Sequence, residues 1–288
     1  DIREDSFNMD VSLLKSLVTH ATKVVIPVHF AGLPADMKRV SEFAEENGLL
    51  VIEDCAHALG AEYRGRRIGD CSFSQMSAFS FHPAKSITSA EGGMVTTNSG
   101  SLANRLRSFR NHGTVRDKEQ TEEWHGPWYY EMNELGHNYR LSELHSALGL
   151  SQVKRLDEFL VKRGTLTRRY RDNLNDSGLI RFQTESDSCS SAHHLMAVQI
   201  DFSKTTISRL TLVKALEEKA IVSGVHYLPV NRHPWYRKNH PQQVSSTPVA
   251  DRYYESAMSL PLFSTMTVED VDRVCDELLA LIRPDIST

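Results

Sequence analysis

The hydrophobic pattern of the first half of the chain alternates between two kinds of segment. Residues 23–30 and 49–52 are continuous apolar runs, and between them residues 36–47 place apolar side chains at helical spacing. Continuous apolar runs are typical of strands buried on both faces of a parallel sheet. A strand, a helix and a strand in such a short stretch form a right-handed crossover unit. The pattern therefore predicts an α/β region with a mostly parallel central sheet.

The same reasoning places further elements around this unit. Alternating or continuous apolar runs predict strands, and apolar residues at helical spacing predict helices, with Ser99 and Ser142 as suitable N-caps. Two strands are expected at 76–81 and 94–97, and helices at 9–20, 101–111 and 142–173.

The pattern changes beyond about residue 155. Residues 180–183 and 194–200 resemble antiparallel strands, and residues 208–219 and 268–281 resemble helices packed over them. We therefore expect two domains: residues 1–154 would be the C-terminal part of a larger α/β domain, and residues 155–288 a smaller α+β domain.

Composition narrows the class of protein. The net charge is -4 and 24% of residues are charged, with basic residues scattered, so nothing favours nucleic acid. The sequence contains no apolar run long enough to span a membrane, and no signal peptide is recognised. Neither a membrane protein nor a secreted protein is therefore indicated. The four cysteines lack CxxC spacing, and the thirteen histidines lack a metal-binding motif. We expect a cytoplasmic protein with no metal.

One lysine stands out for its place in the pattern. Lys85 follows Pro83 on an irregular turn between the two expected strands, and Gly92 and Gly93 allow close approach of the backbone before the second strand begins. An amine in that position can face a cleft. The simpler interpretation is a surface lysine in a polar loop.

An acidic residue ends the second apolar run. Ligands of open α/β sheets bind at the carboxyl ends of the strands, which is where Asp54 is expected. Asp54 could equally be a loop residue or a cap for the segment that follows. His57 could equally be a packed core histidine.

Five segments together resemble the DegT/DnrJ-type sugar aminotransferases, which are fold-type I enzymes that depend on pyridoxal 5'-phosphate. The match spans nearly the whole chain, in the order expected for that family. The segments are 24–32 (VVIPVHFAG), 51–60 (VIEDCAHALG), 79–93 (FSFHPAKSITSAEGG), 135–140 (LGHNYR) and 259–270 (SLPLFSTMTVED).

The resemblance implies roles for four residues. Lys85 matches the lysine that forms an imine with the cofactor and later moves a proton. Asp54 matches the carboxylate that pairs with the pyridine nitrogen and keeps the ring an electron sink. His57 matches a residue that contacts the face and phenolic oxygen of the ring, and Ser80 a hydroxyl that binds the phosphate.

The resemblance also implies a homodimer with shared active sites. Asn138 and Arg140 match a segment supplied by the neighbouring subunit, in which the asparagine reaches the cofactor phosphate. His226 and Tyr227 lie where relatives approach the sugar nucleotide, although the end of a buried strand is an equal interpretation.

The implied reaction moves an amino group from L-glutamate to a nucleotide-linked 4-keto-6-deoxy sugar, with UDP as the expected nucleotide. Residues 128–132 (WYYEM) and 225–230 (VHYLPV) resemble the pseudaminic-acid branch, which serves surface-glycan biosynthesis. One alternative is a sugar dehydratase of the same fold, but those relatives replace the lysine with histidine. Another is a non-catalytic or regulatory cofactor-binding fragment.

One departure from the family concerns the beginning of the chain. Family members carry an earlier segment with a Ser-Gly-Thr phosphate loop and an aromatic residue that stacks on the cofactor. Neither precedes Asp1 in this sequence. We therefore expect a fragment that, alone, binds the cofactor poorly and aggregates.

Overall fold

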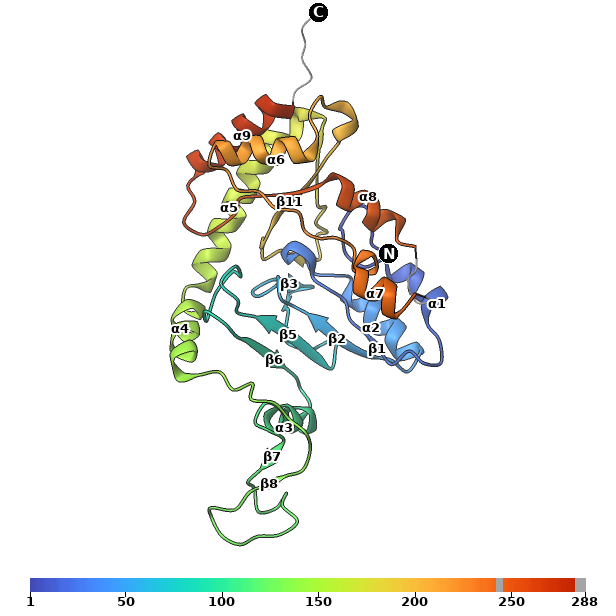
Figure 1. Ribbon diagram of the computed structural model, residues 1–288, viewed down its shortest axis with the longest axis vertical. Coiled ribbons are helices and arrows are strands. Elements are labelled where there is room, and N and C mark those ends of the chain that lie inside the picture. Colours follow the sequence, from blue (N-terminus) through green and yellow to red (C-terminus); the bar gives the residue numbers. More distant parts are fainter. Residues whose placement is uncertain (242–245, 283–288) are drawn as a thin grey trace, which may run out of the picture.

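A four-stranded sheet forms the centre of the protein (Figure 1). The computed structural model describes residues 1–241 and 246–282. Along the sheet the order is β1-β2-β5-β6; β1 pairs with β2 and β2 with β5 in parallel, whereas β5 and β6 are antiparallel. The predicted α/β class with a mostly parallel sheet is confirmed. The strands are β1 (Val24–Val25), β2 (Leu50–Asp54), β5 (Met76–Ser80) and β6 (Gly93–Thr96).

Helix α2 (Met37–Glu46) makes the predicted crossover between β1 and β2. Asp36 caps it by accepting a hydrogen bond from Arg39 N. Its buried face includes Val40, which is fully buried in a cluster with Val51 of β2. The helix thus covers the sheet that carries the site.

Two expected elements at the start of the chain are shorter than predicted. The helix at 9–20 is reduced to a 3-10 turn (Val11–Leu13) and helix α1 (Leu14–Leu17). Leu17 is 50% exposed and Val18 is extended, so this segment has too little apolar surface beneath it to prolong the helix. The strand at 23–30 is regular only in β1, and then continues as a single bridge from Val28 to Asp54.

The long helix expected at 142–173 is in fact two helices. Helix α4 (Glu143–Val153) begins at the N-cap Ser142, as predicted, and α5 (Leu156–Leu174) follows. Arg155 leaves helical geometry, at φ -105° and ψ 3°. Only α5 packs into the core, because α4 has no buried residue.

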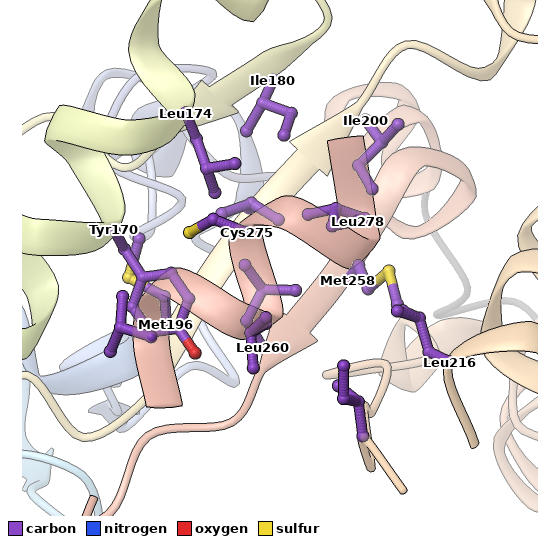
Figure 2. Packing of buried hydrophobic residues seen from close by; sticks show 14 of the residues in the cluster. Tyr170, Leu174, Ile180, Met196, Ile200, Leu216, Met258, Leu260, Cys275 and Leu278 are labelled. Atoms are coloured by element: carbon purple, nitrogen blue, oxygen red, sulfur yellow. The ribbon is translucent and has the colours of Figure 1, made fainter. Parts of the chain in front are cut away.

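A second sheet and three helices enclose the largest hydrophobic cluster, near the C-terminal end of the described chain (Figures 1 and 2). The antiparallel strand order is β12-β11-β9, and α5, α6 and α9 contribute the covering side chains. The sequence did not predict β12, although all four of its residues are buried. The new elements are β9 (Ile180–Phe182), β11 (Met196–Ile200), β12 (Ala257–Leu260), α6 (Arg209–Glu218) and α9 (Val268–Ile282).

Smaller elements complete the fold. The antiparallel pair β7 and β8 follows α3 and projects at the lower end of Figure 1, while β10 pairs with β3 and so ties the second half of the chain to the first. None of the helices in the described ranges is long and apolar enough to cross a membrane. These elements are β3 (Glu62–Tyr63), β4 (Arg66–Arg67), α3 (Gly100–Phe109), β7 (Thr114–Val115), β8 (Glu131–Met132), β10 (Cys189–Ser190), α7 (Pro234–Asn239) and α8 (Pro248–Ser256), with 3-10 turns at Phe30–Gly32, Asn175–Ser177, Phe202–Lys204 and Val230–Arg232.

Candidate active site

A cavity of about 1000 Å³ opens where β2 ends. Asp54 and His57 reach it from the end of β2, Lys85 from the loop between β5 and β6, and Tyr227 from the chain before α7. This is the edge at which parallel sheets place ligands. Part of the lining is apolar, with Ile2, Phe7, Met9, Ile26, Val28 and Phe30 among its side chains.

Lys85 occupies the turn that the sequence indicated. The backbone N–H of Lys85 donates to the carbonyl oxygen of His82 at 2.9 Å. The buried side chains of Phe81 and Ile87 anchor the loop on either side. Burial lowers the pKa of the Lys85 amine, and the charge of Asp54 opposes that shift. A lowered pKa leaves more of the amine unprotonated, which favours a nucleophilic role. The interpretation as a freely solvated surface lysine is not supported.

Asp54 is held by its backbone on both sides. Its N–H donates to Pro27 O at 2.9 Å, and its carbonyl accepts from His29 N at 3.2 Å. Oδ1 accepts from Ala56 N at 3.0 Å, so the carboxylate also caps the following turn. Within the described residues no other hydrogen bond occupies the carboxylate, which leaves acceptor capacity toward the cavity.

His57 is both packed and lining the cavity. Its side chain is buried, and its ring lies 4.4 Å from that of His194. Burial, followed by the charges of Lys85 and His226, lowers the pKa of His57 to about 3. The imidazole is therefore neutral at neutral pH. Its Nδ1 is buried and has no hydrogen-bond partner among the described residues.

The segment at 225–230 brings an aromatic side chain to the cavity. Tyr227 lines the cavity, whereas His226 is turned to Ser259, with 2.7 Å between Nδ1 and Oγ. Burial and then the charge of Asp54 raise the pKa of Tyr227, while burial and then Lys85 lower the pKa of His226. The charge of Asp54 thus affects Tyr227 and the charge of Lys85 affects His226, but only Tyr227 is among the described residues that line the cavity.

Three other predicted site residues are not among the described residues that line the cavity. Ser80 ends β5, and its hydroxyl accepts from His82 N at 3.4 Å. Asn138 and Arg140 are exposed beside the loop that follows α3: Asn138 bridges to Asn111, and Arg140 donates to the Asn111 side chain at 2.6 Å. The structure therefore does not bring Asn138 or Arg140 to this cavity within one chain.

Several residues around the cavity were not identified as site residues by the sequence pattern. Phe30 lies 6.2 Å from the His57 ring and 5.8 Å from that of Tyr253, centroid to centroid. Tyr253 comes from α8, and burial raises the pKa of its phenol. These side chains and His194 come from distant segments, so no local spacing could have joined them.

A buried group of potential metal ligands lies behind the site. Atoms of His29, Glu53 and Cys55 fall within 4.8 Å of one another. His29 Nδ1 already accepts from Ala35 N at 3.0 Å, and its Nε2 faces Glu53 at 2.9 Å. Burial raises the pKa of the Cys55 thiol, so it stays protonated and is a poor ligand. Hydrogen bonding accounts for this group without a metal.

Comparison with known proteins gives the family. The sequence profile of the DegT/DnrJ/EryC1/StrS aminotransferase family matches residues 1–279. The spore coat polysaccharide biosynthesis protein SpsC of Bacillus subtilis is 36% identical over 285 residues, covering 98% of this chain and 72% of SpsC.

Solved structures agree with that assignment. PseC of Helicobacter pylori, an aminotransferase involved in the biosynthesis of pseudoaminic acid, superposes with a TM-score of 0.89 at 28% identity, covering 98% of this chain and 72% of PseC. The PLP form of the putative sugar aminotransferase Spr1654 of Streptococcus pneumoniae superposes with a TM-score of 0.86 at 25% identity. The match covers 98% of this chain and 74% of Spr1654.

The side chains of the cavity suit pyridoxal phosphate. Lys85 offers an amine of lowered pKa, and Asp54 a carboxylate with acceptor capacity left. The buried Nδ1 of His57, which has no hydrogen-bond partner among the residues that the structure describes, is an unusual feature in a folded protein and is consistent with a polar ligand at this place. Together with the match over most of the chain, these features lead to one conclusion. The chain belongs to the DegT/DnrJ/EryC1/StrS aminotransferase family, whose members are pyridoxal-phosphate-dependent sugar aminotransferases.

Proposed function

We propose that this protein transfers an amino group from L-glutamate to a nucleotide-linked 4-keto-6-deoxy sugar, with UDP as the nucleotide, for surface-glycan biosynthesis. The observation that carries the proposal is that Asp54, at the end of β2, and Lys85, in the loop between β5 and β6, line the same cavity. The likeness to PseC and SpsC supports a sugar of this class. Tyr227 supports it further, because it belongs to the segment that resembles the pseudaminic-acid branch and lies in the cavity.

Each residue has a proposed task. Bound pyridoxal phosphate supplies a carbonyl carbon that accepts the amino group and a ring that withdraws electrons from the reacting bond. Lys85 would hold the cofactor and move the proton at the reacting carbon. The carboxylate of Asp54 would keep the pyridine nitrogen protonated. His57, neutral at neutral pH, would lie against the ring, and Ser80 would bind the phosphate.

The active sites would be shared across a homodimer. In this arrangement Asn138 of one subunit reaches the cofactor phosphate of the other, and Arg140 lies beside the substrate. Large apolar side chains near this segment support an interface: Leu135 is 85% exposed and Leu144 of α4 is 84% exposed. Exposed apolar surface of this kind commonly marks a contact with another chain.

Two broader assignments accompany this proposal. We place the enzyme in the cytoplasm, which is supported by four cysteines that all remain free thiols. We also retain a domain boundary after residue 154. Helix α5 begins just beyond it and contributes Leu166, Tyr170 and Leu174 to the C-terminal cluster.

A substrate panel tests the function. Purified protein loaded with pyridoxal phosphate would be incubated with L-glutamate and with UDP- and dTDP-linked 4-keto or 3-keto sugars, and the aminosugars measured by mass spectrometry. We expect the strongest conversion with a UDP-linked 4-keto-6-deoxy sugar, together with glutamate-dependent loss of the visible absorbance of the bound cofactor. Conversion restricted to dTDP-linked or 3-keto sugars would contradict the proposed substrate. No conversion with any sugar, despite bound cofactor, would favour a non-catalytic protein.

A further inference from the structure

Glu53 immediately precedes Asp54 in β2 and points away from it. Side chains alternate along a strand, so Glu53 and Asp54 lie on opposite faces of the sheet. Glu53 is only 3% exposed, whereas Asp54 lines the cavity. A buried carboxylate is costly unless hydrogen bonds satisfy it, so its partners matter.

The partners of Glu53 come from both neighbouring segments of the sheet. Oε2 lies 2.9 Å from His29 Nε2, in the chain that continues from β1. Oε1 accepts from Ser74 at 2.5 Å and from Ser77 at 2.9 Å. Ser77 belongs to β5, the strand that leads into the loop of Lys85. One carboxylate therefore joins three adjacent parts of the sheet just behind the cavity.

The protonation of this network follows from its hydrogen bonds. His29 Nδ1 accepts the N–H of Ala35 at 3.0 Å, so it carries no proton, and Nε2–H must donate to Glu53. Burial alone would raise the pKa of Glu53, but the bonds from His29, Ser74 and Ser77 together hold it below its ordinary value. Glu53 is thus an ionised acceptor for three donors.

The network also secures the backbone on which Asp54 sits. His29, the partner of Glu53, donates its own N–H to the carbonyl of Asp54 at 3.2 Å. Asp54 in turn pairs with Ala78 of β5 in the parallel ladder. Movement of Glu53 would therefore be transmitted to Asp54 on one side and, through Ser77, to β5, which leads into the loop of Lys85, on the other.

We propose that Glu53 is a positioning residue, which through His29, Ser74 and Ser77 fixes the register of Asp54 relative to Lys85 and thereby the geometry in which the cofactor is held. This inference rests on the roles proposed above for Asp54 and Lys85. Glu53 itself touches neither the cavity nor the reacting atoms. A misplacement of about 1 Å at a site of this kind can lower a rate about 100-fold.

Loss of a buried carboxylate lowers stability wherever it sits, so the test must separate positioning from folding. Glu53→Leu removes the acceptor and leaves the Nε2–H of His29 unsatisfied. Glu53→Gln keeps a carbonyl oxygen for His29 and lets the two serine hydroxyls turn to accept from the amide. Val40→Ala, in α2 against the same sheet, serves as the control for lost stability, since Val40 is fully buried and its side chain makes none of these hydrogen bonds.

The dissociation constant of pyridoxal phosphate and the pH titration of its visible absorbance are measured well below the Tm of each variant. We expect Glu53→Leu to weaken cofactor binding at least about tenfold and to shift the pH titration of the cofactor absorbance. Glu53→Gln should recover most of the affinity and most of the parent titration. Val40→Ala should lower the Tm but bind the cofactor like the parent. These readouts do not require the sugar substrate, so a wrong substrate proposal leaves them unaffected.

Parent-like cofactor affinity and titration in Glu53→Leu, with a Tm loss similar to that of Val40→Ala, would overturn the proposal and leave Glu53 a purely stabilising residue. If Glu53→Leu does not fold, the Ser74→Ala variant tests the positioning role instead. That change removes one donor at a half-buried position and should alter affinity and titration in the same direction, by less. Unchanged values for Ser74→Ala would then overturn the proposal.

Discussion

The imidazole ring of His57 lies against that of His194, with 4.4 Å between centroids and 37° between planes. His194 is itself fixed: its N–H donates to Ala31 O at 2.9 Å, and its carbonyl accepts from Arg163 at 3.2 Å. Burial, followed by the charge of His57, lowers the pKa of His194 to about 2. Two neutral rings therefore pack together, and the outer one lines the cavity. His57 is held by a rigid neighbour rather than by a hydrogen bond within the described chain.

This packing gives the first prediction. His194→Ala should leave His57 without support, weaken binding of pyridoxal phosphate and lower the free energy of unfolding by about 2 kcal/mol. His194→Phe keeps a ring against His57 and should bind the cofactor nearly as the parent does. Equilibrium titration with the cofactor and denaturant unfolding measure both effects. Equal affinities for the Ala and Phe variants would show that His194 does not support His57.

Lys85→Ala should abolish the visible absorbance of the bound cofactor and all turnover while the fold remains. Lys85 lies on a loop and is only partly buried, so the change in the free energy of unfolding should stay near about 0.5 kcal/mol. Absorbance spectra, circular dichroism and an aminotransferase assay measure these properties. Borohydride reduction of the parent followed by peptide mapping should place the cofactor on Lys85. Glutamate-dependent turnover that survives the substitution would rule out the assigned role.

Much of the central sheet could be predicted because its signals are local. Continuous apolar runs gave β2 and the crossover, and the position of Asp54 at the end of β2 followed from the parallel topology. The turn chemistry around Lys85 was also visible in the sequence. These features depend on neighbouring residues in the chain, which is the information that periodicity contains.

The rest depends on contacts between distant segments. Strand β12 has four buried residues and pairs with β11, but a short run such as Ala257–Leu260 has no periodicity that separates it from a helix. The break at Arg155 is equally invisible, because α4 is apolar enough to continue the helical pattern without being buried. The hydrogen bonds of Glu53 join three segments and could not be inferred from spacing.

Asp54→Asn should still bind the cofactor but react slower by orders of magnitude. An amide cannot stabilise a protonated pyridine nitrogen as a carboxylate does, and a charge-assisted hydrogen bond contributes about 1.5–3 kcal/mol. Asparagine can still accept from Ala56 N, so the turn that follows should be preserved. Single-turnover kinetics with L-glutamate, monitored through the cofactor absorbance, isolate the affected half-reaction. A rate close to that of the parent would leave Asp54 with only its structural task.

The last prediction concerns stability at low pH. The folded-state pKa values of His57 and His194 are lowered from 6.5 to about 3 and about 2. Below 6.5 the unfolded chain therefore binds protons that the folded protein does not, so the free energy of unfolding falls as the pH falls.

Each such histidine can contribute up to about 1.4 kcal/mol per pH unit in this window. His194→Phe removes one titrating group but keeps the ring packing, so the loss of stability between about pH 6.5 and about pH 4.5 should be smaller than in the parent. Urea unfolding across this range measures the slope for both proteins, without cofactor. A His194→Phe slope equal to that of the parent would mean that His194 is not buried in its neutral form.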